Sequence, residues 1–271
     1  MEDMMIIREI ESKSILSKTG IPIADYVINP YVGCTHSCMF CYARFMKRFT
    51  GHSEEWGDFL DIKINAPDLI PQNSSRYLGK YIFLSSVTDP YLPLEKKYQL
   101  TRKIIEKLIP LKPILGILTK SNLILRDIDL IRQFEKSEIG FSFSTLDEKI
   151  RKNVEPFAST IKNRMNALKE FNEVGIKTYV FISPIMPYLT DWKDIIQKTR
   201  DYADYFMFEN LNVAGTVWAS VKDILEKEYP DLSSKYREIY FEDNQYWEMM
   251  EEEIIQYCEK EKLECRMYFH H

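Results

Sequence analysis

Three of the five cysteines of this chain lie within eight residues, at Cys34, Cys38 and Cys41. Thiolates are strong ligands of iron and zinc, and three in one short loop can each bind one iron of a cubane cluster. A cluster that only carries electrons normally takes four cysteines, but Cys258 and Cys265 lie far along the chain. Three ligands leave one metal position open, which is typical of a catalytic metal. The spacing therefore predicts a reactive metal centre.

The spacing Cys-x3-Cys-x2-Cys, with the aromatic Phe40 before the last cysteine, resembles the signature of the radical S-adenosylmethionine (SAM) superfamily. The resemblance implies that the three thiolates hold one oxygen-sensitive [4Fe–4S] cluster, and that the methionine amino and carboxylate groups of SAM chelate its fourth iron. It implies a one-electron reductant of the flavodoxin or ferredoxin type. It also implies cleavage of SAM to a 5′-deoxyadenosyl radical that abstracts hydrogen from a substrate, with Phe40 near the adenine.

Two other functions use the same residues. A non-enzymatic iron–sulfur protein that carries electrons or senses iron would hold the cluster without turning SAM over. A zinc-binding module would add His36 as a fourth ligand, although zinc loops more often come as paired CxxC or Cys2His2 units. The three functions differ in the metal that the protein binds, in the colour of the protein and in whether it cleaves SAM.

Further segments resemble the spore photoproduct lyase-like (DNA-repair-photolyase-like) branch of this superfamily. The cysteine motif is specific to the superfamily, whereas these segments are specific only to a loose branch. Each falls at a predicted strand end, where ligands bind in parallel βα architectures. They cover roughly residues 27–190 and comprise residues 29–44, 85–91, 100–102, 118–121, 141–145 and 182–185.

Several side chains in these segments suit contacts with SAM. The Ser85 and Ser86 hydroxyls could meet its amino or carboxylate group, and Lys120 offers a cation for the carboxylate, a role that the resemblance also implies. Asp89 could accept from a ribose hydroxyl or from the amino group. Structural roles are the alternative: serines at strand ends often cap helices, Lys120 could be solvated, and Asp89-Pro90 could be a turn.

Later strand ends supply four more candidates. Of Ser142 and Ser144, we expect only one to face the barrel interior, and we favour Ser144. Ser183 and Ile185 are expected to meet the adenine, partly through the backbone. Capping of a helix is again the alternative for the serines.

One position departs from the branch. Spore photoproduct lyase carries a cysteine that returns hydrogen to the product radical, and its position matches Val87 here. Because this loop holds no cysteine, repair of spore photoproduct by that route is not expected. Tyr91 is a candidate hydrogen relay, although most tyrosines are packing residues. The substrate stays open between a nucleic acid or nucleoside, by analogy with the branch, and a small molecule or peptide.

Short apolar runs alternate with amphipathic stretches along the chain, which predicts parallel strands joined by right-handed helical crossovers. Six such units are too few for a closed eight-stranded barrel, so we predict an α/β fold with an open, partial (βα)6 TIM-like barrel. Strands are expected near residues 25–29, 81–85, 114–119, 139–144, 177–183 and 205–209. Helices are expected over residues 39–49, 95–109, 123–135, 160–174 and 192–202.

The predicted core spans residues 25–210 and follows an N-terminal extension over residues 1–24. Residues 50–75 break the βα pattern and are predicted to be an inserted excursion over one mouth of the barrel. His52 and Trp56 either shape a substrate lid there or belong to a solvated loop with a buried indole. Cys258 and Cys265 are expected to be ordinary buried thiols. The C-terminal extension, residues 211–271, is expected to hold helices at 216–228, 234–240 and 244–261 and a possible edge strand at 263–269.

Composition limits the class of protein. Of the 271 residues, 45% are hydrophobic and 28% charged, and no apolar run approaches the roughly 18 residues that span a bilayer. The N-terminus lacks the features of a signal peptide, and an odd number of cysteines does not suit a secreted disulfide framework, so we expect a cytoplasmic protein with no membrane partner. The net charge of −5 offers no general attraction to nucleic acid, and no glycine-rich phosphate loop is present.

Overall fold

Six parallel strands pair in chain order, as the sequence predicts. The computed structural model describes residues 5–242 and 245–270. Each of the six strands pairs in parallel with the next, and the extra strand β11 (Cys265–Met267) continues the sheet beside the last one. The six are β3 (Tyr26–Ile28), β6 (Tyr81–Leu84), β7 (Ile114–Thr119), β8 (Lys136–Phe143), β9 (Lys177–Ile185) and β10 (Tyr205–Asn210).

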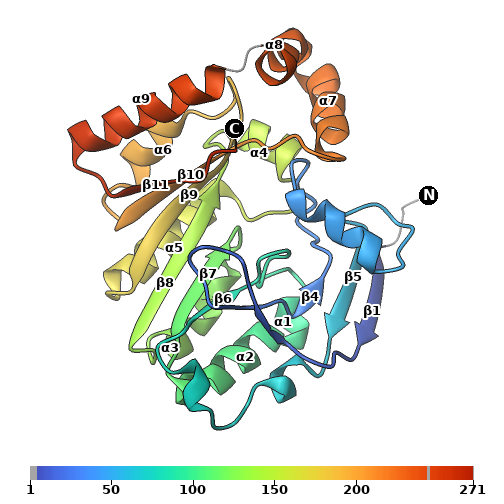
Figure 1. Cartoon of the computed structure of the whole chain (residues 1–271), viewed down its shortest axis with the longest axis vertical. Coiled ribbons are helices and arrows are strands. Elements are labelled where there is room, and N and C mark those ends of the chain that lie inside the picture. Colours follow the sequence, from blue (N-terminus) through green and yellow to red (C-terminus); the bar gives the residue numbers. More distant parts are fainter. Residues whose placement is uncertain (1–4, 243–244, 271) are drawn as a thin grey trace.

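The main sheet is open. Its order is β11-β10-β9-β8-β7-β6-β3-β2, and β2 (Leu16–Lys18) runs antiparallel to β3 at one edge. The edge strands β2 and β11 do not pair with each other, so the described strands form a partial barrel rather than a closed one. The predicted fold class is confirmed. Figure 1 shows the strands running diagonally across the molecule with helices packed against them.

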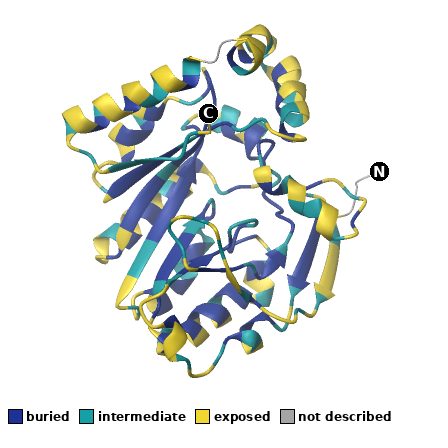
Figure 2. Cartoon of the chain, viewed as in Figure 1, coloured by how far each residue is buried: buried dark blue, intermediate teal, exposed yellow. Residues whose placement is uncertain are grey.

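Crossover helices bury their apolar side chains against the sheet. In α5, Thr160 accepts a hydrogen bond from the Asn163 N–H at the start, and Leu168 and Phe171 then point into the core. Figure 2 shows the central strands of the main sheet largely buried and the outer sides of the helices exposed. The crossover helices are α1 (Glu95–Tyr98), α2 (Leu100–Leu108), α3 (Ile128–Ile131), α4 (Glu148–Val154), α5 (Ile161–Glu173) and α6 (Trp192–Thr199).

Two segments predicted as α-helices are largely 3-10 helices. The helix expected at 39–49 is η1 (Tyr42–Phe49), and the one expected at 123–135 divides into η5 (Asn122–Asp127) and the short α3. Over such short segments, apolar spacing does not distinguish 3.0 from 3.6 residues per turn. The remaining 3-10 helices are η2 (Ala66–Leu69), η3 (Ser75–Tyr77) and η4 (Ile109–Leu111).

Residues 50–75 contain a strand that the sequence pattern does not predict. This strand, β5 (Phe59–Lys63), pairs in parallel with β1 (Ile6–Ile10) and antiparallel with β4 (Tyr31–Val32) in a second, three-stranded sheet. Asp61 interrupts the apolar run of β5, but it is buried with its Oδ1 3.0 Å from His52 Nε2. His52 and Trp56 lie on the loop before β5 and are buried against Phe59, which agrees with the expected loop with a buried indole and gives no support to a lid.

Three helices follow β10 at one end of the molecule (Figure 1). Cys258 and Cys265 form a disulfide with their Cα atoms 6.5 Å apart, so the expectation of two separate thiols is wrong. The left-handed backbone of Lys262 reverses the chain after the last helix and brings the two cysteines within bonding reach. The helices are α7 (Val217–Glu228), α8 (Pro230–Phe241) and α9 (Tyr246–Glu261).

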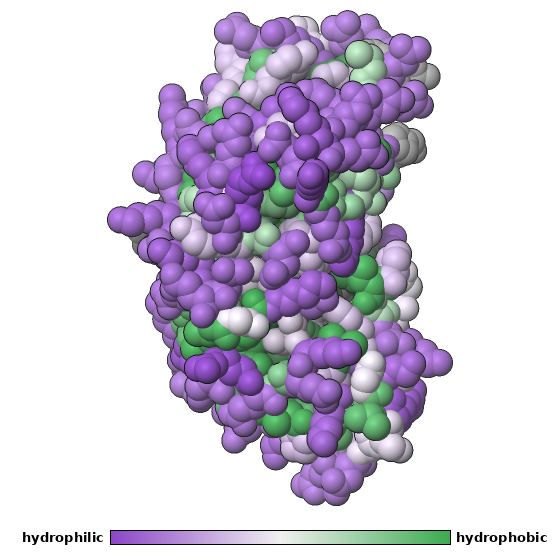
Figure 3. Space-filling view, turned by 90° about the vertical axis from the view of Figure 1, so that its left-hand side faces the viewer, coloured by the Kyte–Doolittle hydropathy of each residue, from purple (hydrophilic) through white to green (hydrophobic). Residues whose placement is uncertain are grey.

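Parts of the sequence predictions fall outside the described residues, namely positions 1–4 of the N-terminal extension, Asn244 at the start of the last predicted helix, and His271. Among the described residues, no helix is long and apolar enough to cross a membrane. The face shown in Figure 3 is mostly hydrophilic, with apolar groups in small separate areas.

Candidate functional site

A pocket of about 460 Å³ opens at the carboxyl ends of the parallel strands. Successive strands each bring a polar side chain to it: Ser85 after β6, Lys120 after β7, Ser142 on β8, Ser183 on β9 and Glu209 on β10. This is the end of a parallel βα sheet where ligands bind. The pocket is large enough for a cofactor-sized ligand.

The opposite end of the barrel interior is filled by side chains. Gly140 leaves room for Tyr179, since a Cβ at that position would lie 2.1 Å from the tyrosine ring. Tyr179 lines the pocket and stacks on Tyr205 with 4.9 Å between ring centroids. Tyr205 donates to Glu138, which also pairs with Lys177 at 2.9 Å. A ligand therefore enters from the carboxyl ends of the strands.

The cysteine loop lies between β4 and η1 and is held from two sides. Gly33 has a φ of +94°, and a Cβ there would lie 2.5 Å from the Phe59 carbonyl oxygen on β5, so the close approach of these strands requires glycine. The Gly33 carbonyl accepts a hydrogen bond from Thr88 Oγ1 at 2.5 Å. The unpredicted second sheet thus fixes the position of the loop.

Cys34, Cys38 and Cys41 are free thiols, and all three line the pocket. Burial raises the pKa of each thiol, and the Lys120 ammonium partly opposes this increase at Cys38 and Cys41. Neutral buried thiols become ligands when a metal cation displaces their protons. Within residues 5–242 and 245–270, no three His, Cys, Asp or Glu side chains converge closely enough to hold a single metal ion.

Lys120 is a cation that shares the pocket with these thiols. Its Nζ donates to Ser142 Oγ at 2.9 Å and lies 5.6 Å from the centre of the Phe40 ring. Burial acts to lower the pKa of Lys120, but nearby negative charge, that of Glu155 first, outweighs it and the pKa is raised. The ammonium is therefore charged at neutral pH, beside an aromatic ring and a hydroxyl.

Ser85 and Ser86 lie on the loop after β6 and differ in their partners. Ser85 has a φ of 67°, is 5% exposed, and its buried hydroxyl has no hydrogen-bond partner in the described structure. Ser86 is held by Asn29, whose Oδ1 accepts from the Ser86 N–H at 2.9 Å, and the Tyr42 hydroxyl donates to the Ser86 carbonyl. The Ser85 hydroxyl is thus the group on this loop that is free to bind a ligand.

Asp89 and Tyr91 are committed to the protein itself. The Asp89 carboxylate lines the pocket but accepts from Thr119 Oγ1 at 2.7 Å, the Lys120 N–H at 2.9 Å and the Tyr91 N–H at 2.8 Å. These bonds tie the loop after β6 to the end of β7. Tyr91 is fully buried and does not line the pocket, so the structure gives no support to its role as a hydrogen relay.

The prediction that Ser144 faces the interior in place of Ser142 is wrong. Ser142 lines the pocket, whereas the Ser144 hydroxyl donates to Glu155 Oε1 at 2.8 Å behind the strand. Glu155 is buried there and pairs with Arg164 at 2.9 Å, which draws Ser144 away from the pocket. Residues two apart share one face of a regular strand, but β8 ends at Phe143, so Ser144 lies beyond the strand and does not follow the face that Ser142 lines. Ile185, expected at the adenine, is buried and does not line the pocket.

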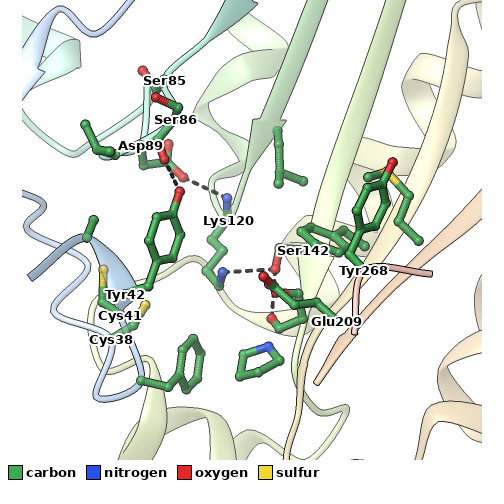
Figure 4. A pocket seen from close by; sticks show the side chains of 18 of the residues that line it. Cys38, Cys41, Tyr42, Ser85, Ser86, Asp89, Lys120, Ser142, Glu209 and Tyr268 are labelled. Carbon is green, nitrogen blue, oxygen red and sulfur yellow. Dashed lines mark hydrogen bonds between the residues drawn. The ribbon is translucent and has the colours of Figure 1, made fainter. Parts of the chain in front are cut away.

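The side of the pocket opposite the thiols carries residues that the sequence analysis missed. The Ser183 hydroxyl donates to Glu209 Oε2 at 2.6 Å, and Glu209 Oε1 lies 3.2 Å from His270 Nε2. Figure 4 shows Cys38 and Cys41 on one side, Glu209 and Tyr268 on the other, and Lys120 and Ser142 between them. Glu209 ends a predicted strand, so the strand-end rule makes it a candidate, and Tyr42 could have been found because it directly follows the last cysteine.

Comparisons with known proteins agree with this arrangement. The family model of the Radical SAM superfamily matches residues 28–199. An uncharacterized protein of Methanocaldococcus jannaschii is 40% identical over 231 residues, which cover 85% of this chain and 86% of that protein. The radical SAM Nalpha-GlyT isomerase of Pseudomonas phage M6 is 23% identical over 220 residues, which cover 79% of this chain and 45% of the isomerase. A solved spore photoproduct lyase variant with bound AdoMet and dinucleoside spore photoproduct has a TM-score of 0.72 at 16% identity and covers 97% of this chain and 82% of its own.

Proposed function

Because this chain belongs to the radical SAM superfamily, we propose that Cys34, Cys38 and Cys41 hold a [4Fe–4S] cluster and that the adjoining pocket binds SAM. The chain is a radical SAM enzyme with the fold of spore photoproduct lyase. One observation carries the proposal: three free thiols of one loop line the same pocket as an unpartnered hydroxyl and a charged lysine. When bound, the two cofactors supply reductive cleavage of a carbon–sulfur bond and a carbon radical that abstracts hydrogen.

The residues around the thiols fit the polar end of SAM. Lys120 is a buried cation that would hold a carboxylate, and its bond to Ser142 fixes the direction of the ammonium. The unpartnered Ser85 hydroxyl would bind the amino or carboxylate group. Phe40 presents an aromatic face beside Lys120 that would contact the adenine. Ser86 and Asp89 shape the loop by their bonds to Asn29 and Thr119.

We assign the opposite side of the pocket to the substrate. Phe181 and Tyr268 line this side together with the Glu209 carboxylate, and Tyr42 lies across from them beside Cys41 (Figure 4). Aromatic faces stack on planar rings, and a carboxylate accepts hydrogen bonds from ring or exocyclic N–H groups. This chemistry favours a substrate with a nucleobase-like ring. The likeness in fold to a lyase with a bound dinucleoside supports the same class.

Anaerobic reconstitution with iron and sulfide, followed by reduction with dithionite in the presence of SAM, tests the proposal. We expect a brown protein that forms 5′-deoxyadenosine, and we expect Cys38→Ala to lose both iron and product. Cys258→Ala is the matched control, since Cys258 lies in the distant disulfide. A colourless zinc protein would contradict the cluster, and a reducible brown protein without turnover would contradict the enzyme. Deuterium transfer from labelled nucleosides into 5′-deoxyadenosine then identifies the substrate.

A further inference from the structure

The helix η1 exposes aromatic side chains that its own packing does not require. Ala43 is its buried residue, whereas Phe45 is 44% exposed and Phe49 67% exposed. The Arg48 guanidinium lies 5.4 Å from the centre of the Phe45 ring and 4.7 Å from that of Phe49. Large aromatic groups kept in solvent beside a cation are typical of a surface that binds a partner.

This helix is also a local exception to the charge of the chain. The whole sequence has a net charge of −5, but residues 42–49 contain Arg44, Lys47 and Arg48 and no acid. Within the described part of the chain, Arg48 forms no ion pair, and Lys47 pairs only with the highly exposed Glu55 at 3.5 Å. A shallow cleft separates η1 from the uncharged residues 214–217. Phe45, Lys47, Arg48 and Phe49 therefore form a basic and aromatic surface, which we call the docking face.

The docking face lies next to the cysteine loop but outside the pocket. η1 begins one residue after Cys41, and Arg44 Nη2 donates to the Cys38 carbonyl at 3.3 Å. None of the four docking-face residues lines the pocket. A substrate must contact the reacting atoms, which a molecule held on this face does not. An electron needs only a short path through the protein, and η1 provides that path.

We infer that the docking face receives an acidic one-electron reductant, an inference that rests on the proposed function. One electron passes from the reduced partner, for example from a flavodoxin hydroquinone that becomes a semiquinone, to the metal centre held by the three cysteines. No bond forms or breaks in this transfer. Redox encounters are small and are steered by complementary charge, which fits two cations flanking two exposed rings.

The experiment compares two ways of supplying the electron to the reconstituted protein. The K47E/R48E variant reverses the charge of the docking face, and K103E/K107E, on α2, makes the same change elsewhere. We expect K47E/R48E to lower the rate of 5′-deoxyadenosine formation about tenfold when a bacterial flavodoxin or a bacterial [4Fe–4S] ferredoxin supplies the electron, and to leave the dithionite-driven rate within about twofold. The control variant K103E/K107E should form 5′-deoxyadenosine at the wild-type rate with the protein reductants and with dithionite.

Direct binding gives a readout independent of turnover. By isothermal titration calorimetry at low salt, we expect flavodoxin to bind the wild type and the control equally and K47E/R48E about tenfold more weakly, with the difference lost at high salt. The neutral variant F49S should show a smaller loss. Iron content and circular dichroism establish that the variants are folded.

Three results would overturn the inference. One is that K47E/R48E loses as much of the rate with dithionite as with the protein reductants, which would mean that the substitutions damage the site itself. A second is an unchanged rate with both protein reductants. A third is that K47E/R48E loses binding of a single-stranded oligonucleotide while keeping the protein-driven rate, which would assign the face to nucleic acid. Absence of 5′-deoxyadenosine with dithionite in the wild type would instead contradict the proposed function.

Discussion

The two sides of the pocket are built in different ways. The thiol side comes from one loop and the strand ends next to it, and its groups are fixed by bonds such as those of Asn29 and Asp89. The opposite side joins Glu209 to Tyr268 and His270, which the chain reaches only after three more helices. The thiols expected to hold the cluster therefore lie in one short segment of the sequence. The opposite side of the pocket forms only when segments that are far apart in the sequence pack together.

The largest effect should separate the cysteines of the loop from those of the disulfide. Cys41→Ala removes one of three ligands, so we expect iron binding and 5′-deoxyadenosine formation to be abolished. The double variant Cys258→Ala/Cys265→Ala should keep wild-type iron content, measured by metal analysis. Equal loss of iron in both variants would mean that the loop alone does not define the metal site.

The next effect should separate cofactor binding from metal binding within the thiol side. Lys120→Met removes a charge-assisted hydrogen bond, so we expect the Kd for SAM to rise about 10- to 100-fold while iron content is unchanged. Equilibrium dialysis with labelled SAM measures this. Lys149→Met, an exposed position on α4, is the matched control. A wild-type Kd in Lys120→Met would remove this residue from the SAM site.

A smaller effect should test how the second sheet supports the loop. Gly33→Ala places a Cβ at positive φ within 2.5 Å of the Phe59 carbonyl, so we expect a loss of about 1–3 kcal/mol in the free energy of unfolding of the metal-free protein. Gly51 also has positive φ, but nothing lies within 4 Å of an added Cβ, so Gly51→Ala should lose less. Urea unfolding compares the two. Equal losses would show that the contact with β5 is unimportant.

The smallest effect concerns the opposite side alone. The hydrogen bond that His270 donates to Glu209 raises the pKa of His270 above its usual 6.5, because the carboxylate favours the imidazolium form. The stabilisation is fully present below pH 6.5 and is lost as the pH rises through the raised pKa. We expect Glu209→Gln to return the pKa of His270, followed by NMR, toward 6.5 without changing SAM binding. A weaker affinity for SAM in this variant would show that both sides of the pocket contribute to SAM binding.

The sequence is sufficient for the six parallel strands and for the three thiols, because both depend on short-range patterns. It does not reveal β5, whose buried Asp61 makes the segment look polar until His52 is found beside it. It misplaces Ser144, because β8 ends at Phe143 and the Ser144 hydroxyl then turns to Glu155, which pairs with Arg164. It misses the disulfide, which depends on one left-handed residue at the end of α9.

Glu209 shows the limit most clearly. Its place at the end of a predicted strand makes it a candidate, but carboxylates at strand ends are common on protein surfaces, so the sequence does not single it out. Its neighbours Ser183 and His270 come from β9 and from the segment after β11. Only the packing of these strands brings the three groups together.

Low-temperature electron paramagnetic resonance of the dithionite-reduced protein, recorded with and without SAM, addresses the open metal position most directly. We expect a [4Fe–4S]⁺ signal whose g values shift when SAM is added, and the same signal without a shift in Lys120→Met at a SAM concentration that saturates the wild type. A signal that SAM leaves unchanged in the wild type would mean that a fourth protein ligand already closes the cluster.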